Sequence, residues 1–123
     1  MDTRDKIVNW SGQLALPAGA ACVTGCFDPL TAAHLERLEQ IASAHPGGLT
    51  VIITDLADAI LPSLARAQLV AGLRPVHRVI VAGDRLEEIC AQAPSEAIYR
   101  EESAEKLIRQ DLIRHVHARH HGD

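Results

Sequence analysis

Three short apolar runs constrain the fold of this chain more than any other feature of its sequence. They are Ala20–Gly25, Leu49–Thr54 and His77–Gly83, each rich in β-branched residues and bounded by turn-forming residues, as buried strands are. Glu96–Arg100 is a weaker fourth candidate. Their hydrophobicity is continuous rather than alternating, which is typical of parallel strands covered on both faces.

Segments with the apolar spacing of helices lie around these runs. The spacing predicts helices over Ala32–Ala44, Leu61–Leu73, Arg85–Ala93 and Ser103–His120, and a short helix outside the sheet over Asp5–Leu16. Strands that alternate with helices imply right-handed crossovers. We therefore expect an α/β fold, a three-layer Rossmann-like domain with a parallel sheet of four to five strands flanked by helices.

Length and composition narrow the class of protein. The 123 residues fit a single domain, with residues 1–17 as a lead-in and residues 103–121 as a C-terminal helix. With one Phe, one Trp, one Tyr and a net charge of −4, the chain lacks the aromatic faces and the basic surface of a nucleic-acid binder. No segment approaches the ~20 apolar residues that cross a bilayer, and the N-terminus lacks the apolar core of a secretory signal. We expect neither a nucleic-acid partner nor a membrane.

The cysteines indicate a reducing compartment. Cys22, Cys26 and Cys90 make an odd count and lack the paired spacing of a metal site. On one extended strand, the Cα atoms of Cys22 and Cys26 would be roughly 13 Å apart, whereas a disulfide allows about 7 Å. Reduced thiols favour a cytoplasmic protein.

The segment Thr24–His34, TGCFDPLTAAH, contains the residues best suited to bind a ligand. In folds of this kind, ligands bind at the carboxyl ends of the strands, where the strand order reverses. The first complete apolar run ends at Gly25, and a helix is expected to begin soon after it. The unpaired N–H groups at the start of that helix favour a bound phosphate.

The stretch VTGCFDPLTAAHLERLEQIA resembles a family of nucleotidyltransferases. Its signature is a strand, then G-x-F-D, then H-x-G-H at the start of a helix, and its members include glycerol-3-phosphate cytidylyltransferases and heptose-phosphate adenylyltransferases. The similarity extends over roughly Lys6 to Gly83. It implies transfer of a nucleotidyl group from ATP or CTP to a small phosphorylated alcohol or sugar, with release of pyrophosphate. It also implies Mg²⁺ bound with the nucleotide, and a homodimer.

The resemblance assigns roles to particular residues of this chain. His34 and Thr31 would be catalytic. Thr54 and Asp55 end the second complete apolar run at the same edge of the sheet, and from this position they could contact the substrate. The nucleotide would be bound by Gly25, Cys26, Phe27, Asp28, Ala33 and Arg66. No dedicated metal site is expected, because the sequence has no carboxylate cluster.

The chain departs from the family signature at two positions. Thr31 replaces the first histidine and Ala33 replaces the glycine, so only His34 remains of the two histidines. The family's later loop, similar to ISTTKI, has no counterpart here. Two hypotheses therefore stay open, a nucleotidyltransferase with weakened activity and an inactive relative that binds a nucleotide or metabolite or acts as a scaffold.

Several of these residues also have a purely structural interpretation. Thr31 can be a helix N-cap, and His34 can bond within its own loop. Asp28 fits a loop organiser better than a catalytic base, and Phe27 is most simply a core residue. Arg66 either faces the phosphates or faces solvent from an amphipathic helix.

The remaining polar residues are interpreted in the same way. Thr54 and Asp55 could form only a strand-to-helix turn, which Asp favours. The tail places His117 and His121 one helical turn apart, a spacing that can hold zinc. A solvated helix end explains the same histidines.

Overall fold

The computed structural model of the protein describes residues 2–56 and 58–102. The helix predicted over Ser103–His120 and the histidines of the tail lie outside the described residues. The described elements are, in chain order, a 3-10 turn at Thr3–Lys6, β1 (Ile7–Val8), β2 (Ala21–Gly25), α1 (Ala32–Ser43), β3 (Leu49–Thr54), α2 (Ser63–Ala71), β4 (Val76–Gly83), α3 (Leu86–Ala91), a 3-10 turn at Ser95–Ala97 and β5 (Ile98–Arg100). None of the helices in this part of the chain is both long and apolar enough to span a membrane.

The strands form one five-stranded sheet in the order β1-β4-β3-β2-β5. Every neighbouring pair is parallel, and β2 lies between β3 and β5, so that Val23 pairs with both Val51 and Tyr99. The expected α/β class with an all-parallel, Rossmann-like sheet is therefore confirmed. The apolar runs form the strands nearly as predicted, and the fourth is shorter because Ser95–Ala97 forms a 3-10 turn after Pro94.

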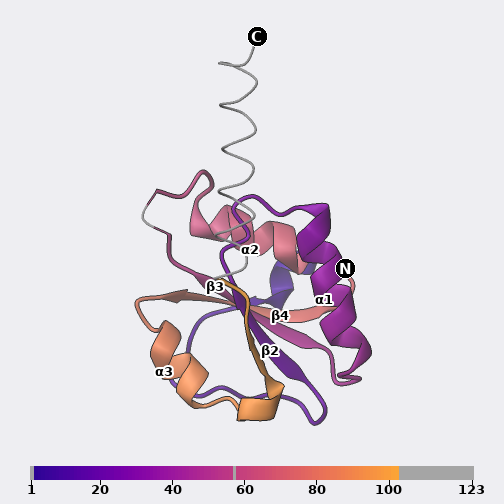
Figure 1. Ribbon diagram of the computed structural model, residues 1–123. Coiled ribbons are helices and arrows are strands. Elements are labelled where there is room, and N and C mark those ends of the chain that lie inside the picture. Colours follow the sequence, from indigo (N-terminus) through magenta and orange to yellow (C-terminus); the bar gives the residue numbers. More distant parts are fainter. Residues whose placement is uncertain (1, 57, 103–123) are drawn as a thin grey trace.

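Helices α1 and α2 cover one face of the sheet and α3 covers the other (Figure 1). Neighbouring strand residues point to opposite faces, so Val23 packs under α1 and α2 while Cys22 packs on the side of α3. Burial on both faces explains why the strands have no polar alternation. Because α3 is short, the extended segment after β1 helps to cover its face with Trp10, Leu14 and Leu16.

The prediction of a short helix over Asp5–Leu16 is wrong. Only a 3-10 turn forms, and Ile7 and Val8 then join the sheet edge beside β4. The apolar residues in this segment have a spacing close to that of a helix, but Gly12 has a φ of +93°, which belongs to a turn and not to a right-handed helix. These residues instead pack on the sheet from an extended backbone.

Candidate functional site

The strand order reverses at β2, and this places the segment after Gly25 at the position where α/β sheets bind ligands. From β2 the chain proceeds through α1 to β3 and through α2 to β4 on one side, whereas β5 lies on the other side of β2. The expected location of the turn is confirmed.

Phe27 and Asp28 hold the turn in place, Phe27 by packing in the core and Asp28 by hydrogen bonds to another loop. Phe27 is 2% exposed and packs in the core, as predicted, with an unusual positive φ of 52°. The Asp28 carboxylate accepts hydrogen bonds from the backbone N–H groups of Ile60, at 2.6 Å, and Leu61, at 2.8 Å. The expectation that Asp28 organises the loop is confirmed, and its partner is the loop between β3 and α2.

Thr31 and His34 form a reciprocal cap at the start of α1. The Thr31 hydroxyl accepts the backbone N–H of His34 at 3.4 Å, and the Thr31 backbone N–H donates to Nδ1 of His34 at 2.9 Å. This is a capping box in which histidine replaces the usual Glu or Gln. The N-cap role of Thr31 is therefore confirmed, and so is the bonding of His34 within its own loop.

The cap also fixes the chemical state of the His34 imidazole. Since Nδ1 accepts a hydrogen bond from a backbone N–H, the proton of the neutral ring lies on Nε2. His34 is 7% exposed, and desolvation by burial lowers its pKa. At neutral pH this residue is therefore a neutral hydrogen-bonding group and not a cation. Ala33 beside it is exposed, so the space over its methyl group is open.

Arg66 ties three segments together from the first turn of α2. Its Nη1 donates to the carbonyl oxygens of Cys26 and Thr54, both at 2.9 Å, and its Nε donates to the carbonyl oxygen of Leu61 at 3.1 Å. Arg66 is 2% exposed, so the solvent-facing alternative is wrong. Its guanidinium therefore lies at the carboxyl ends of β2 and β3, in contact with the backbone there.

The ends of β2 and β3 are also joined directly. The Cys26 thiol lies 3.0 Å from the Thr54 hydroxyl, and both residues are buried. None of the three cysteines forms a disulfide, as expected. Of the two residues proposed to contact substrate, Thr54 is a buried structural partner, whereas Asp55 is exposed.

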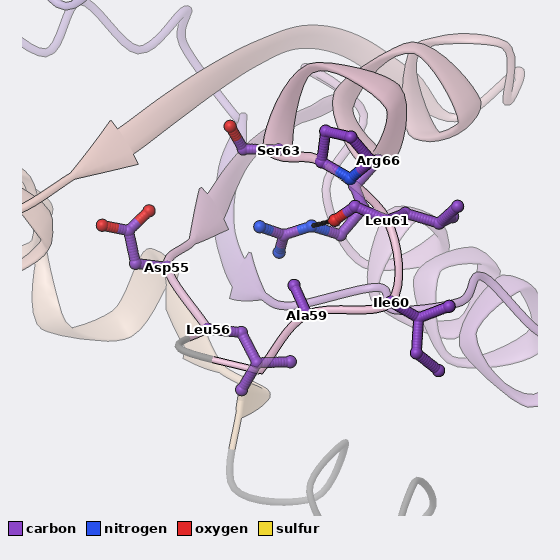
Figure 2. A pocket seen from close by; sticks show the side chains of 8 residues that line it. Asp55, Leu56, Ala59, Ile60, Leu61, Ser63 and Arg66 are labelled. Atoms are coloured by element: carbon purple, nitrogen blue, oxygen red, sulfur yellow. Dashed lines mark hydrogen bonds between the residues drawn. The ribbon is translucent and has the colours of Figure 1, made fainter.

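A cavity of about 390 Å³ opens between the end of β3 and the start of α2. Its walls come from the loop between these elements and from the first turn of α2, and Figure 2 shows the Arg66 guanidinium reaching into it between Asp55, Ser63 and Ala59. The complete lining is Asp55, Leu56, Ala59, Ile60, Leu61, Pro62, Ser63 and Arg66. The structure thus brings Asp55 and Arg66 to one cavity and leaves Thr31 and His34 in the cap of α1.

No protein-family model matches the chain, and no curated protein matches it significantly. The site must therefore be interpreted from its own geometry. No group of three or more His, Cys, Asp and Glu side chains gathers in a metal-binding arrangement within residues 2–56 and 58–102.

Sequence reasoning missed two polar groups at this edge. Ser63 lines the cavity, and Glu102 follows β5 and bonds to the hydroxyl of Thr24 and to Nε of Arg100. Burial acts to raise the pKa of Glu102, but hydrogen bonds from Thr24, its own backbone and Arg100 lower it overall. Ligands lie at the carboxyl ends of strands, and Glu102 comes two residues after the end of β5. A sequence search that included the two residues after this strand would therefore have found Glu102.

Proposed function

We propose that this protein is nucleotidyltransferase-like and transfers a nucleotidyl group from ATP or CTP to a small phosphorylated alcohol or sugar. The observation that carries the proposal is the position of the Gly25–His34 turn at the strand-order reversal, directly before the N-terminus of α1. A triphosphate at this point would meet backbone N–H groups and the positive end of a helix. Phe27 and Asp28 of the G-x-F-D sequence hold the turn in the conformation that would face the triphosphate.

The reaction requires positioning more than covalent chemistry from the protein. An oxygen of the acceptor phosphate attacks the α-phosphorus and forms a new P–O bond. The bond from the α-phosphorus to its bridging oxygen breaks, and the electron pair leaves with pyrophosphate. His34 would stabilise the developing charge on the phosphates, aided by Thr31. Mg²⁺ would accompany the triphosphate, held mainly by phosphate oxygens and water.

A second candidate is a nucleotide- or metabolite-binding protein without turnover. It is favoured by the capping box, since this engages Nδ1 of His34 and the Thr31 hydroxyl and since His34 is neutral. Loss of one transition-state contact typically lowers the rate ~10²–10³-fold. This chain has one histidine where the family signature has two.

The direct test is release of pyrophosphate. The protein is mixed with ATP or CTP, Mg²⁺ and a panel of phosphorylated acceptors, and pyrophosphate is measured with a coupled assay. Release that depends on both the nucleotide and an acceptor supports the enzyme. Nucleotide binding in calorimetry without release supports the binding protein, and the absence of both contradicts the proposal.

A double variant tests the turn itself. Thr31→His/Ala33→Gly restores the two family residues, and the open space over Ala33 accommodates a closer nucleotide. We expect tighter nucleotide binding and faster pyrophosphate release. The matched control is Thr31→His/Ala32→Gly, which carries the same residue types with the glycine one position earlier on an equally exposed part of α1. Equal behaviour of the two variants would contradict close approach at position 33.

A further inference from the structure

A small cavity lies at the amino ends of β3 and β4, at the opposite edge of the sheet from the Gly25–His34 turn. Its volume is about 40 Å³, and its lining is Pro17, Gly47, Leu49, Thr50, His77 and Arg78. The lining contains no acidic residue, and its ionisable side chains, His77 and Arg78, are both basic. The charge of this amino-end cavity therefore favours an anion over a cation.

A shift in the pairing of β3 with β4 brings both basic residues to the amino-end cavity. Leu49 pairs with the first residue of β4 and Thr50 pairs with Arg78, so that His77 has no partner on β3. Neighbouring residues of a regular strand point to opposite faces, whereas the extra residue of a bulge re-aims a side chain. The imidazole of His77 packs against Gly48, where a Cβ atom would overlap it. The bulge thus allows consecutive basic residues to line one cavity.

Thr50 places a hydroxyl between the sheet and the segment that precedes β2. It pairs with Cys22, so its side chain points to the face of the sheet that α3 covers. Leu14 and Leu16 pack on the same face, and Pro17 lines the cavity. Thr50 is 2% exposed, and its hydroxyl makes no hydrogen bond with any residue that the structure describes. A buried hydroxyl of this kind is stabilised by a bound polar partner.

Arg78 adds a cation with donors to spare. Its guanidinium carries several N–H groups, and its one bond within the described ranges runs from Nη1 to the Ala15 carbonyl oxygen at 3.0 Å. It forms no ion pair with a described residue, and its side chain is half-buried. A partly desolvated guanidinium without a carboxylate partner attracts an anion, because hydrogen bonds to an ionised partner are the strong ones.

We propose that the amino-end cavity binds a small monovalent anion, with chloride as the ion that fits it. A volume of about 40 Å³ holds one particle slightly larger than a water molecule, whose share of liquid volume is about 30 Å³. The Thr50 hydroxyl, the Arg78 guanidinium and an N–H group of His77 would donate to the ion. Because Arg78 also holds the Ala15 carbonyl oxygen, the ion would help to fix the segment before β2 on the sheet. This site is independent of the proposed function.

The test follows the backbone amide signals of the protein by NMR while sodium chloride replaces sodium gluconate at constant ionic strength. Gluconate is too large for the cavity, so general screening stays the same throughout. We expect saturable changes at Gly47, His77 and Arg78. Thr50→Val keeps the shape of the side chain without its hydroxyl and should weaken chloride binding about tenfold, the effect of one hydrogen bond to a charged group. Thr50→Ser keeps the hydroxyl and should bind chloride nearly as tightly as the wild type.

Arg78→Met should abolish the changes at Gly47 and His77. The matched control is Arg85→Met, which removes an exposed arginine beyond the other end of β4 and changes the net charge equally. It should leave the chloride affinity intact. If the wild-type protein shows no saturable change, the cavity holds water only and the inference is overturned. Unchanged affinity in both Arg78→Met and Thr50→Val, or an equal loss in Arg85→Met, would overturn it as well.

Discussion

Replacement of Arg66 by methionine should strongly destabilise the folded protein. The arginine holds the carbonyl oxygens of Cys26 and Thr54 through buried hydrogen bonds of 2.9 Å. Methionine fills most of the same space but donates nothing, so both carbonyl groups lose the hydrogen bond from Arg66. A third bond, to the Leu61 carbonyl oxygen at 3.1 Å, is half-buried and contributes less.

The expected loss follows from these contacts. An unsatisfied buried carbonyl costs about 1–3 kcal/mol, so two cost roughly 2–6 kcal/mol. Removal of a buried cation offsets part of this, because the guanidinium is no longer desolvated. We expect a net loss of about 2–4 kcal/mol in the free energy of unfolding. That is a large share of the roughly 5–15 kcal/mol typical of a domain.

Urea denaturation followed by circular dichroism measures this loss. With a slope of about 1–3 kcal/mol per molar urea, the midpoint should fall by about 1–2 M. The matched control is Arg78→Met, because the half-buried Arg78 side chain makes one hydrogen bond among the described residues, a solvent-exposed bond from Nη1 to the Ala15 carbonyl oxygen at 3.0 Å. It should cost less than about 1 kcal/mol. Equal midpoints for Arg66→Met and Arg78→Met would refute the role given to Arg66.

Two further predictions concern titratable groups. Burial lowers the pKa of His34 from its ordinary value of 6.5, so its contribution to stability is present above that pH and is lost as the pH falls through the folded-state pKa. His34→Gln should therefore show a smaller fall in urea midpoint between about pH 7.5 and about pH 5.5, and an unchanged fall would contradict this. Burial, and then the nearby Cys90, raises the pKa of Cys22 to about 12. Mass spectrometry after brief alkylation should find Cys90 labelled before Cys22, and Cys90→Ser should leave little rapid labelling.

The strands could be predicted from sequence because burial on both faces requires a short run of mostly apolar residues. A central strand is buried at consecutive positions and is therefore mostly apolar, and Leu49–Thr54 is buried throughout, with Thr50 and Thr54 as its polar residues. The two-residue strand β1 is too short to show such a run. Ile7 and Val8 become a strand because they pair with Val79 and Ile80, a contact between distant parts of the chain that no local pattern reveals.

In the candidate site, too, the features set by local sequence could be predicted and the contacts between distant segments could not. The cap of α1 and the organising role of Asp28 could be predicted, because Thr, Asp and Pro at those positions have strong local preferences. The partners could not be predicted, since Asp28 and Arg66 bond to backbone atoms of other segments. The helical spacing of α2 marks position 66 as near the core but does not state whether an arginine there meets solvent, phosphate or carbonyl groups.

The hydrogen bonds at this edge explain how the turn can keep its shape whether or not it retains the reaction. Asp28, the pair Thr31 and His34, and two of the three guanidinium nitrogens of Arg66 all bond to the chain itself. The turn is therefore held by the protein, and no phosphate is needed to order it. Substitution at Ala33 should thus alter nucleotide affinity without opening the turn. Substitution of Thr31 removes the helix cap, and substitution of Arg66 should disturb the turn and the cavity together.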